Sequence, residues 1–176
     1  MNYYLIGFPG CGKTTLGREL SRLTGIPFID LDERIELEQG KRIIELMPLV
    51  GEKRFREIER ATLREVAECH AIVACGGGTP CLPENMDLMN TTGTTIWLTT
   101  STERLIARLC LPEHRAKRPQ IASLSDEEIA AYVRHTITLR TPHYAQARLQ
   151  FDSTDIETAA ETTATALRLA EKLHLL

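Results

Sequence analysis

Residues 7–14 read GFPGCGKT and match the pattern G-x-x-x-x-G-K-[ST]. They follow the short apolar run Tyr3–Ile6, which suits a buried strand, and they open a segment, residues 14–23, with helical spacing of its apolar side chains. In such a strand–loop–helix unit the glycines let successive backbone N–H groups point at phosphate oxygens, and the helix N-terminus adds its positive dipole end. The stretch therefore predicts a binding loop for a nucleoside triphosphate.

The chemistry of this loop assigns a role to each part of it. Lys13 can reach the β and γ phosphates, and Thr14 can offer its hydroxyl to Mg²⁺. The loop alone fits a GTPase, a hydrolytic ATPase or a small-molecule kinase. Guanine recognition usually needs an Asn-Lys-x-Asp segment, which the sequence lacks, and 176 residues leave little room for the extra domains of a motor ATPase. A small kinase is the reading that remains. The expected nucleotide-binding loop residues are Gly10, Cys11, Gly12, Lys13, Thr14 and Thr15.

Composition bounds the class of protein. With 43% hydrophobic and 26% charged residues, the 176-residue chain suits a single globular domain. A net charge of −3 argues against nucleic acid or an anionic membrane as partner. Five cysteines without a CxxC pair indicate reduced thiols, and the apolar residues before Gly7 are too few for a signal peptide or a membrane span. A cytoplasmic protein is expected.

Short apolar runs alternate with longer segments of helical period. Runs of this length suit strands buried on both faces of a parallel sheet, with crossover helices covering both sides. Capping-box patterns at Thr100–Glu103, Ser125–Glu128 and Thr154–Glu157 predict three helix starts. Residues 110–124 show neither period and predict a mobile basic loop. The expected strands are Tyr3–Ile6, Pro27–Ile29, Ala71–Ala74, Thr95–Leu98 and Leu149–Phe151, and further helices are expected over 51–68 and 156–173.

Four features could form a second substrate site, and each has a plainer explanation. Asp30 and Asp32 alternate at the end of the second strand, so both carboxylates could reach one site, although either could simply cap the next helix. Arg56 lies three residues before Glu59 on a predicted helix, where it could fork a carboxylate or only join a charged face. Arg140 could be a favourable charge at a helix end. The glycines 76–78 could admit a ligand to the backbone or form a flexible turn.

Taken in order, these segments closely resemble the shikimate kinase family. The resemblance rests on GFPGCGKT, FIDLDERIE, GEKRFREIE, ACGGGTP, KRP and RTPHY, which together span most of residues 1–151. It implies a three-layer α/β/α fold of the P-loop NTPase type, with a five-stranded parallel sheet of order 2-3-1-4-5. It also implies transfer of the ATP γ-phosphoryl group to the 3-hydroxyl of shikimate, in aromatic amino acid biosynthesis, by a monomer.

On the nucleotide side, the resemblance implies that Thr14 binds Mg²⁺ and that Asp30 assists, through water. Lys13 and the loop amides would hold the phosphates. Arg118, in a Lys-Arg-Pro lid at about 109–124, would swing over the phosphates and neutralise charge in the transition state. The distance from Arg108 to Arg118 is longer than usual in the family, so Arg108 is not assigned an adenine-stacking role.

On the acceptor side, the resemblance implies that Asp32 accepts the hydroxyl proton and helps to fix the ring. Arg56 and Arg140 would clamp the shikimate carboxylate, and Gly77 and Gly78 would let the backbone bond the hydroxyls. The substrate-binding region would be about 31–62 within one kinase domain, 1–176. A gluconate or nucleoside monophosphate kinase would not explain Arg56, Arg140 and the glycines together. A non-catalytic module would be expected to lose Lys13, Asp32 or Arg118, and all three are present.

Overall fold

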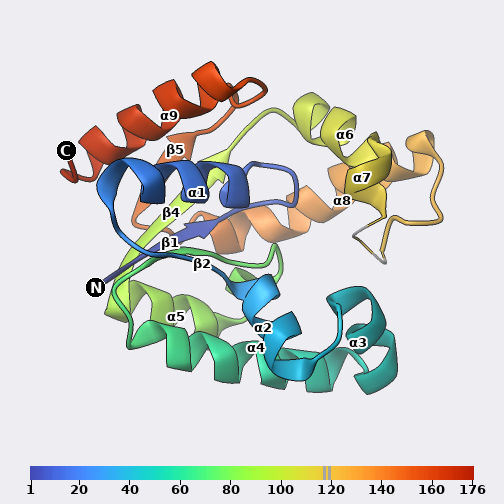
Figure 1. Ribbon diagram of the computed structural model, residues 1–176. Coiled ribbons are helices and arrows are strands. Elements are labelled where there is room, and N and C mark those ends of the chain that lie inside the picture. Colours follow the sequence, from blue (N-terminus) through green and yellow to red (C-terminus); the bar gives the residue numbers. More distant parts are fainter. Residues whose placement is uncertain (117, 119) are drawn as a thin grey trace.

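The computed structural model describes residues 1–116, 118 and 120–176, so Lys117 and Pro119 of the predicted lid lie outside the described residues. Its centre is a five-stranded parallel sheet of order β2-β3-β1-β4-β5 (Figure 1). The predicted strand order is confirmed. The strands are β1 (Asn2–Ile6), β2 (Phe28–Asp30), β3 (Ile72–Ala74), β4 (Gly93–Thr99) and β5 (Leu149–Asp152).

Strand β1 lies in the middle of the sheet because its side chains are apolar or hydrogen-bonded on both faces. All five of its residues are buried, and Tyr4 pairs with Val73 of β3 on one side and with Thr95 of β4 on the other. The Tyr4 hydroxyl, inside the core, bonds Thr92 at 2.8 Å and accepts from Asn2 at 3.0 Å. Its strand leads directly into the glycine loop, so the best-packed part of the sheet carries that loop.

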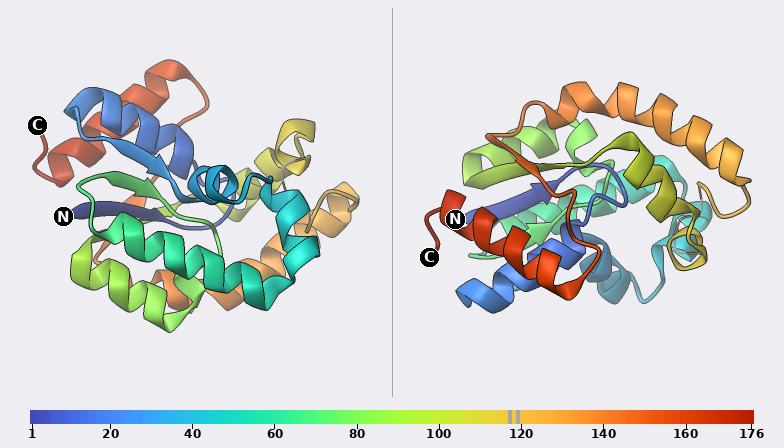
Figure 2. Two further views of the ribbon diagram at one scale, coloured as in Figure 1. Left: turned by 60° about the horizontal axis from the view of Figure 1, so that its bottom comes forward. Right: turned by 90° about the horizontal axis from the view of Figure 1, so that it is seen from above.

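Helices cover both faces of the sheet, as the α/β prediction requires. Helices α1 (Lys13–Thr24) and α9 (Ala159–Lys172) lie on one face. Helices α4 (Glu52–Ala67), α5 (Pro83–Thr92) and α8 (Asp126–Tyr144) lie on the other, and both views of Figure 2 show the same three layers. The three-layer α/β/α architecture is therefore confirmed.

The remaining helices extend beyond the carboxyl ends of the strands. Two short helices, α2 (Leu31–Gln39) and α3 (Ile43–Val50), form one arm, and α6 (Thr102–Cys110) with α7 (Pro112–Arg115) forms the other. The arms stand at one end of the molecule, and both termini lie at the opposite end (Figure 1). A one-turn 3-10 helix, η1, follows β3 at Thr79–Cys81. In the described part of the chain, every helix is too short or too polar to cross a bilayer.

One of the three predicted helix starts is confirmed. The Ser125 hydroxyl accepts from the Glu128 N–H while the Glu128 carboxylate accepts from the Ser125 N–H, which is a complete capping box. The prediction at Thr100–Glu103 is wrong by one residue, because Ser101 caps α6 through the N–H of Arg104. Within the predicted loop 110–124 the structure contains the short helix α7.

The predicted start at Thr154–Glu157 is wrong. Helix α9 begins at Ala159, where Thr158 and Glu161 form the capping box. The Thr154 hydroxyl instead donates to Asp152 at 2.6 Å, and Glu157 binds arginine side chains from α6. Both residues of the expected box are thus used in a turn that precedes the helix.

Candidate active site

A cleft of about 360 Å³ opens at the carboxyl ends of the strands, between the two arms. Parallel sheets commonly bind ligands at this edge. Except for Cys11, all the site residues predicted from the sequence line it: Gly10, Gly12, Lys13, Thr14, Thr15, Asp30, Asp32, Arg56, Gly77, Gly78, Arg118 and Arg140. Cys11 is buried, and its N–H donates to the Phe8 carbonyl at 3.1 Å.

The glycine loop has the shape that phosphate binding requires. Gly10 and Gly12 have φ values of +89° and +95°, in the left-handed region that side chains disfavour. A Cβ at Gly12 would also lie 2.1 Å from Ile156 Cδ1. Gly12 precedes α1 without a side-chain cap, so N–H groups at the start of that helix are available to an anion. The Lys13 ammonium curls back over the loop and donates to the Gly7 carbonyl at 2.9 Å.

Asp30 acts both as a helix cap and as a neighbour of the loop. One carboxylate oxygen accepts from the N–H groups of Asp32 and Glu33, which caps α2. Its other oxygen accepts from the Thr14 hydroxyl at 2.7 Å. Asp30 therefore caps the helix, as the plainer explanation predicted, and also lies beside Thr14 in the cleft, because one carboxylate has two oxygens. A hydroxyl and a carboxylate side by side in the cleft are oxygen ligands of the kind that Mg²⁺ prefers.

Asp32 does not lie on an extended strand, as the alternating pattern had suggested. Strand β2 ends at Asp30, and Asp32 belongs to the first turn of α2. Burial raises the pKa of Asp32 to about 7, and the charges of Asp30 and Glu59 add to the rise while Lys13 opposes it. A carboxyl group with such a pKa is suited to accept a proton near neutral pH.

Arg56 is held by a buried carboxylate that sequence reasoning left out of the site. Its guanidinium donates to Glu59 at 3.0 Å, on the same face of α4. Glu59 is 1% exposed, and its second oxygen accepts from the Thr79 hydroxyl at 2.7 Å. A Cβ at Gly78 would lie 2.7 Å from the Arg56 guanidinium, so the glycine turn and this arginine are in close contact.

Three cations of the cleft lack an acidic partner. Within residues 1–116, 118 and 120–176, no carboxylate forms an ion pair with Lys13, Arg118 or Arg140. Arg118 donates to the His114 carbonyl at 2.7 Å, and Arg140 lies over the Phe8 ring at 5.7 Å. The cleft is therefore arranged to receive anionic groups from a ligand.

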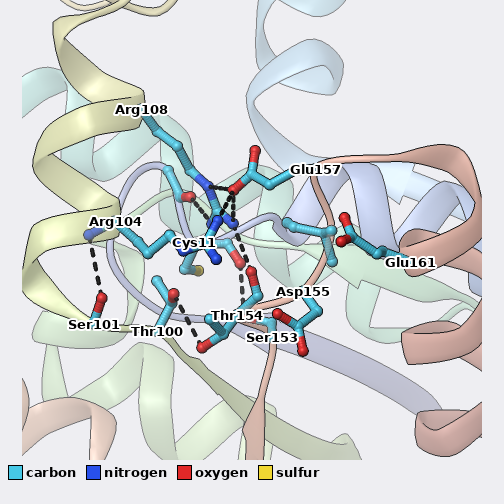
Figure 3. Close-up of polar contacts among 12 residues, drawn as sticks. Cys11, Thr100, Ser101, Arg104, Arg108, Ser153, Thr154, Asp155, Glu157 and Glu161 are labelled. Carbon is cyan, nitrogen blue, oxygen red and sulfur yellow. Dashed lines mark hydrogen bonds and ion pairs between the residues drawn. The ribbon is translucent and has the colours of Figure 1, made fainter.

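Arg108 uses its guanidinium to join the glycine loop to the turn before α9 (Figure 3). It donates to the Gly10 carbonyl at 2.9 Å, to the Thr154 carbonyl at 2.9 Å and to Glu157 at 2.7 Å. Arg108 is 8% exposed, and it holds the pKa of Glu157 below its ordinary value. Nearby, Ser153 donates to the Cys11 carbonyl at 2.8 Å. The loop is thus anchored from behind at two consecutive carbonyls.

We expect Arg108→Met to lower the free energy of unfolding by about 1–3 kcal/mol, because the Gly10 and Thr154 carbonyls would lose a buried donor. Arg104→Met is the matched control, since Arg104 is an exposed partner of the same Glu157 and does not reach the loop. It should cost less than about 1 kcal/mol. Urea denaturation of both variants checks the difference, and equal losses would contradict an anchoring role for Arg108.

Comparison with known proteins agrees with this geometry. A sequence model described as shikimate kinase matches residues 9–171. The chain belongs to the shikimate kinase family. A shikimate kinase of Parabacteroides distasonis is 42% identical over 159 residues, which cover 90% of this chain and 91% of the relative. A shikimate kinase of Bacteroides thetaiotaomicron is 38% identical over 173 residues, covering 98% of both chains.

Solved structures of shikimate kinases have the same fold. The crystal structure of the enzyme from Bacteroides thetaiotaomicron superposes with a TM-score of 0.93 at 36% identity, covering 99% of this chain and 98% of that one. The Acinetobacter baumannii enzyme in complex with shikimate has a TM-score of 0.83 at 28% identity, covering 98% and 93%. A gluconokinase from Sinorhizobium meliloti, with a TM-score of 0.55 at 17% identity, shares the fold alone. Family membership makes this chain an ATP-dependent kinase of shikimate.

Proposed function

We propose that the cleft holds MgATP and shikimate together and transfers the γ-phosphoryl group to the 3-hydroxyl, giving shikimate 3-phosphate and ADP. The observation that carries this proposal is the meeting, in one cleft, of a phosphate-binding loop, a carboxyl group with a pKa near 7 and cations without acidic partners. Phosphoryl transfer depends on positioning and charge stabilisation more than on covalent catalysis, and these groups supply both.

On the nucleotide side, Lys13 and the N–H groups at the start of α1 bind the phosphates. Arg118 neutralises charge that develops on the transferred group, which is consistent with its lack of an acidic partner. Thr14 and, through water, Asp30 would hold Mg²⁺, and the Thr14 hydroxyl lies 2.7 Å from the Asp30 carboxylate. The metal supplies charge neutralisation on the phosphate oxygens when bound.

On the acceptor side, Asp32 accepts the proton of the attacking hydroxyl. Arg56 and Arg140 bind the substrate carboxylate, for which the planar guanidinium is suited because it offers parallel donors. The backbone N–H groups of Gly77 and Gly78 bind ring hydroxyls. Neither of these two N–H groups has an acceptor among the described residues, although both glycines line the cleft.

The arrangement of the chain fits a single kinase domain, residues 1–176, that works as a monomer. The substrate-binding region, about 31–62, includes α2 and α3, and the lid, about 109–124, includes α7. Cytoplasmic location is supported by five free cysteines, which are typical of a reducing compartment.

The proposal is tested by steady-state ADP release with MgATP in the presence and absence of shikimate. Gluconate and nucleoside monophosphates serve as alternative acceptors. We expect ADP release to depend on shikimate and to stay at the background rate with the other acceptors. Turnover with gluconate or a nucleoside monophosphate, and none with shikimate, would contradict the assignment of Arg56, Arg140 and the glycines to shikimate.

A further inference from the structure

Tyr144 is a buried residue beside the cleft that the reaction as described does not use. It is the last residue of α8 and lies one helical turn after Arg140. Its hydroxyl donates to the Gly77 carbonyl at 2.6 Å, and its ring packs against Trp97 with centroids 6.0 Å apart. Burial raises the pKa of Tyr144, so the phenol stays protonated and remains a donor across the physiological range. The contact joins helix α8 to the glycine turn.

The direction of the Gly77 carbonyl determines the direction of the next N–H group. A trans peptide is planar, and its C=O and N–H bonds point in opposite directions. The described chain has no cis peptide bond. Because the Gly77 carbonyl points at Tyr144, the Gly78 N–H points away from α8. That N–H has no acceptor among the described residues, and Gly78 lies against the Arg56 guanidinium. It is therefore a free donor beside the proposed carboxylate clamp.

A peptide between two glycines needs such an anchor. Glycine is the residue with the widest choice of backbone conformation, so the Gly77–Gly78 peptide can rotate more easily than its neighbours. A side chain at Gly77 is excluded, since its Cβ would lie 2.7 Å from Pro9 Cδ and 3.2 Å from Arg140. Without side chains, the backbone of the turn can approach the ligand closely, but the same two glycines make the turn less rigid. The bond from Tyr144 restores the rigidity without occupying the cleft.

We propose that Tyr144 is a positioning residue for the acceptor substrate, whose hydroxyl fixes the Gly77–Gly78 peptide with the Gly78 N–H facing the ligand. The inference rests on the proposed role of the glycine turn in binding shikimate. One turn of α8 then serves the acceptor twice, because Arg140 contacts the ligand and Tyr144 orients the backbone that contacts it. Tyr144 itself does not touch the substrate.

The test compares Tyr144→Phe with Tyr4→Phe. Each variant removes one buried hydroxyl, and Tyr4 lies in β1 outside the cleft. We expect Tyr144→Phe to raise the KM for shikimate about 5- to 20-fold, the equivalent of one lost hydrogen bond, and to change the KM for ATP less than about 2-fold. Tyr4→Phe should lower the melting temperature and leave both KM values unchanged.

A second measurement keeps the inference testable if Tyr144→Phe is too unstable for kinetics. Amide hydrogen exchange of segment 76–79, relative to the rest of the sheet, should be faster in Tyr144→Phe and unchanged in Tyr4→Phe. An unchanged shikimate KM in a folded Tyr144→Phe enzyme, or an equal rise in both KM values, would overturn the inference. Wild-type enzyme without shikimate-dependent turnover would instead overturn the proposed function, so the two failures are distinguishable.

Discussion

Asp32→Asn is expected to lower kcat about 10²- to 10⁴-fold, the usual range for loss of a general base. The amide keeps the size of the side chain, but it cannot accept the proton of the attacking hydroxyl. Since Asp32 does not belong to the phosphate loop, ATP binding should be nearly unchanged. Steady-state kinetics and direct ATP titration measure the two effects separately. Glu33→Gln, an exposed neighbour on α2 that pairs with Arg18, is the matched control and should keep full activity.

The pKa of Asp32 adds a pH dependence to this prediction. The folded-state value of about 7 lies above the ordinary value of 3.8, so the ionised carboxylate is disfavoured in the folded protein. The protonated Asp32 carboxyl therefore contributes to the stability of the fold. This contribution is full below about pH 4 and is lost as the pH rises through about 7. Asp32→Asn should therefore have a higher melting temperature than the wild type at pH 8 and a similar one at pH 4.

Activity should follow the opposite trend. In the wild type, kcat/KM should rise with pH through a value near 7 and then level off, because the base must be ionised. In Asp32→Asn the residual kcat/KM should no longer rise with pH through this range. Normal turnover in the variant, or an unchanged pH profile, would remove Asp32 from the reaction.

Arg140→Ala is expected to raise the KM for shikimate about 10²- to 10³-fold, because loss of a charged hydrogen-bonding partner typically costs 2–5 kcal/mol. The KM for ATP should change less than about 3-fold. Arg140 has no acidic partner among the described residues, so the substitution leaves no protein carboxylate uncompensated. Arg134→Ala, an exposed position on the same helix, is the control and should leave both KM values unchanged.

A substrate analogue identifies the group that Arg140 binds. The methyl ester of shikimate lacks the negative charge and should bind poorly to the wild type. In Arg140→Ala the ester and the acid should differ less than in the wild type, because one of the two arginines that bind the charge has been removed. An equal rise in the KM for ATP and for shikimate, or a full preference for the acid in the variant, would contradict the carboxylate clamp.

The sequence predicted the fold well because its decisive signals are local. Short apolar runs such as Tyr3–Ile6 have few alternatives to a buried strand, and all five expected strands are present with shifts of one or two residues at their ends. The glycine loop was also predictable, since its spacing is required by backbone contacts with phosphate. The strand order came from resemblance to a family and is confirmed by the pairing of β1 with β3 and β4.

The errors arose where a side chain has two possible partners. Thr154 and Glu157 have the spacing of a capping box, but Glu157 is bound by Arg108, which is distant in sequence. Asp32 was placed on a strand because its alternation with Asp30 continues past the end of β2. Local pattern cannot decide such cases, because the competing partner arrives only with the tertiary fold.

The supporting residues of the site could not be assigned from sequence alone. Glu59 was noticed only as a neighbour of Arg56, but it is buried and bonds the hydroxyl of Thr79 in η1, which is 20 positions away in the sequence. Tyr144 belongs to the segment RTPHY, but its bond to the Gly77 carbonyl joins residues 67 positions apart. The spacing of Tyr144 one turn after Arg140 was the available signal, because it places both on the same side of a helix.

The position of the new phosphate ester tests the central claim most directly. Wild-type enzyme is incubated with MgATP and shikimate, and the products are analysed by two-dimensional ¹H–³¹P NMR. Besides the signals of ADP, we predict one new phosphate-ester signal that couples to the proton on ring carbon 3, in equal amount to the ADP formed. A phosphate-ester signal coupled to a proton on another ring carbon, or ADP accompanied by inorganic phosphate and no ester, would contradict the arrangement of Asp32, the arginines and the phosphate loop proposed for this cleft.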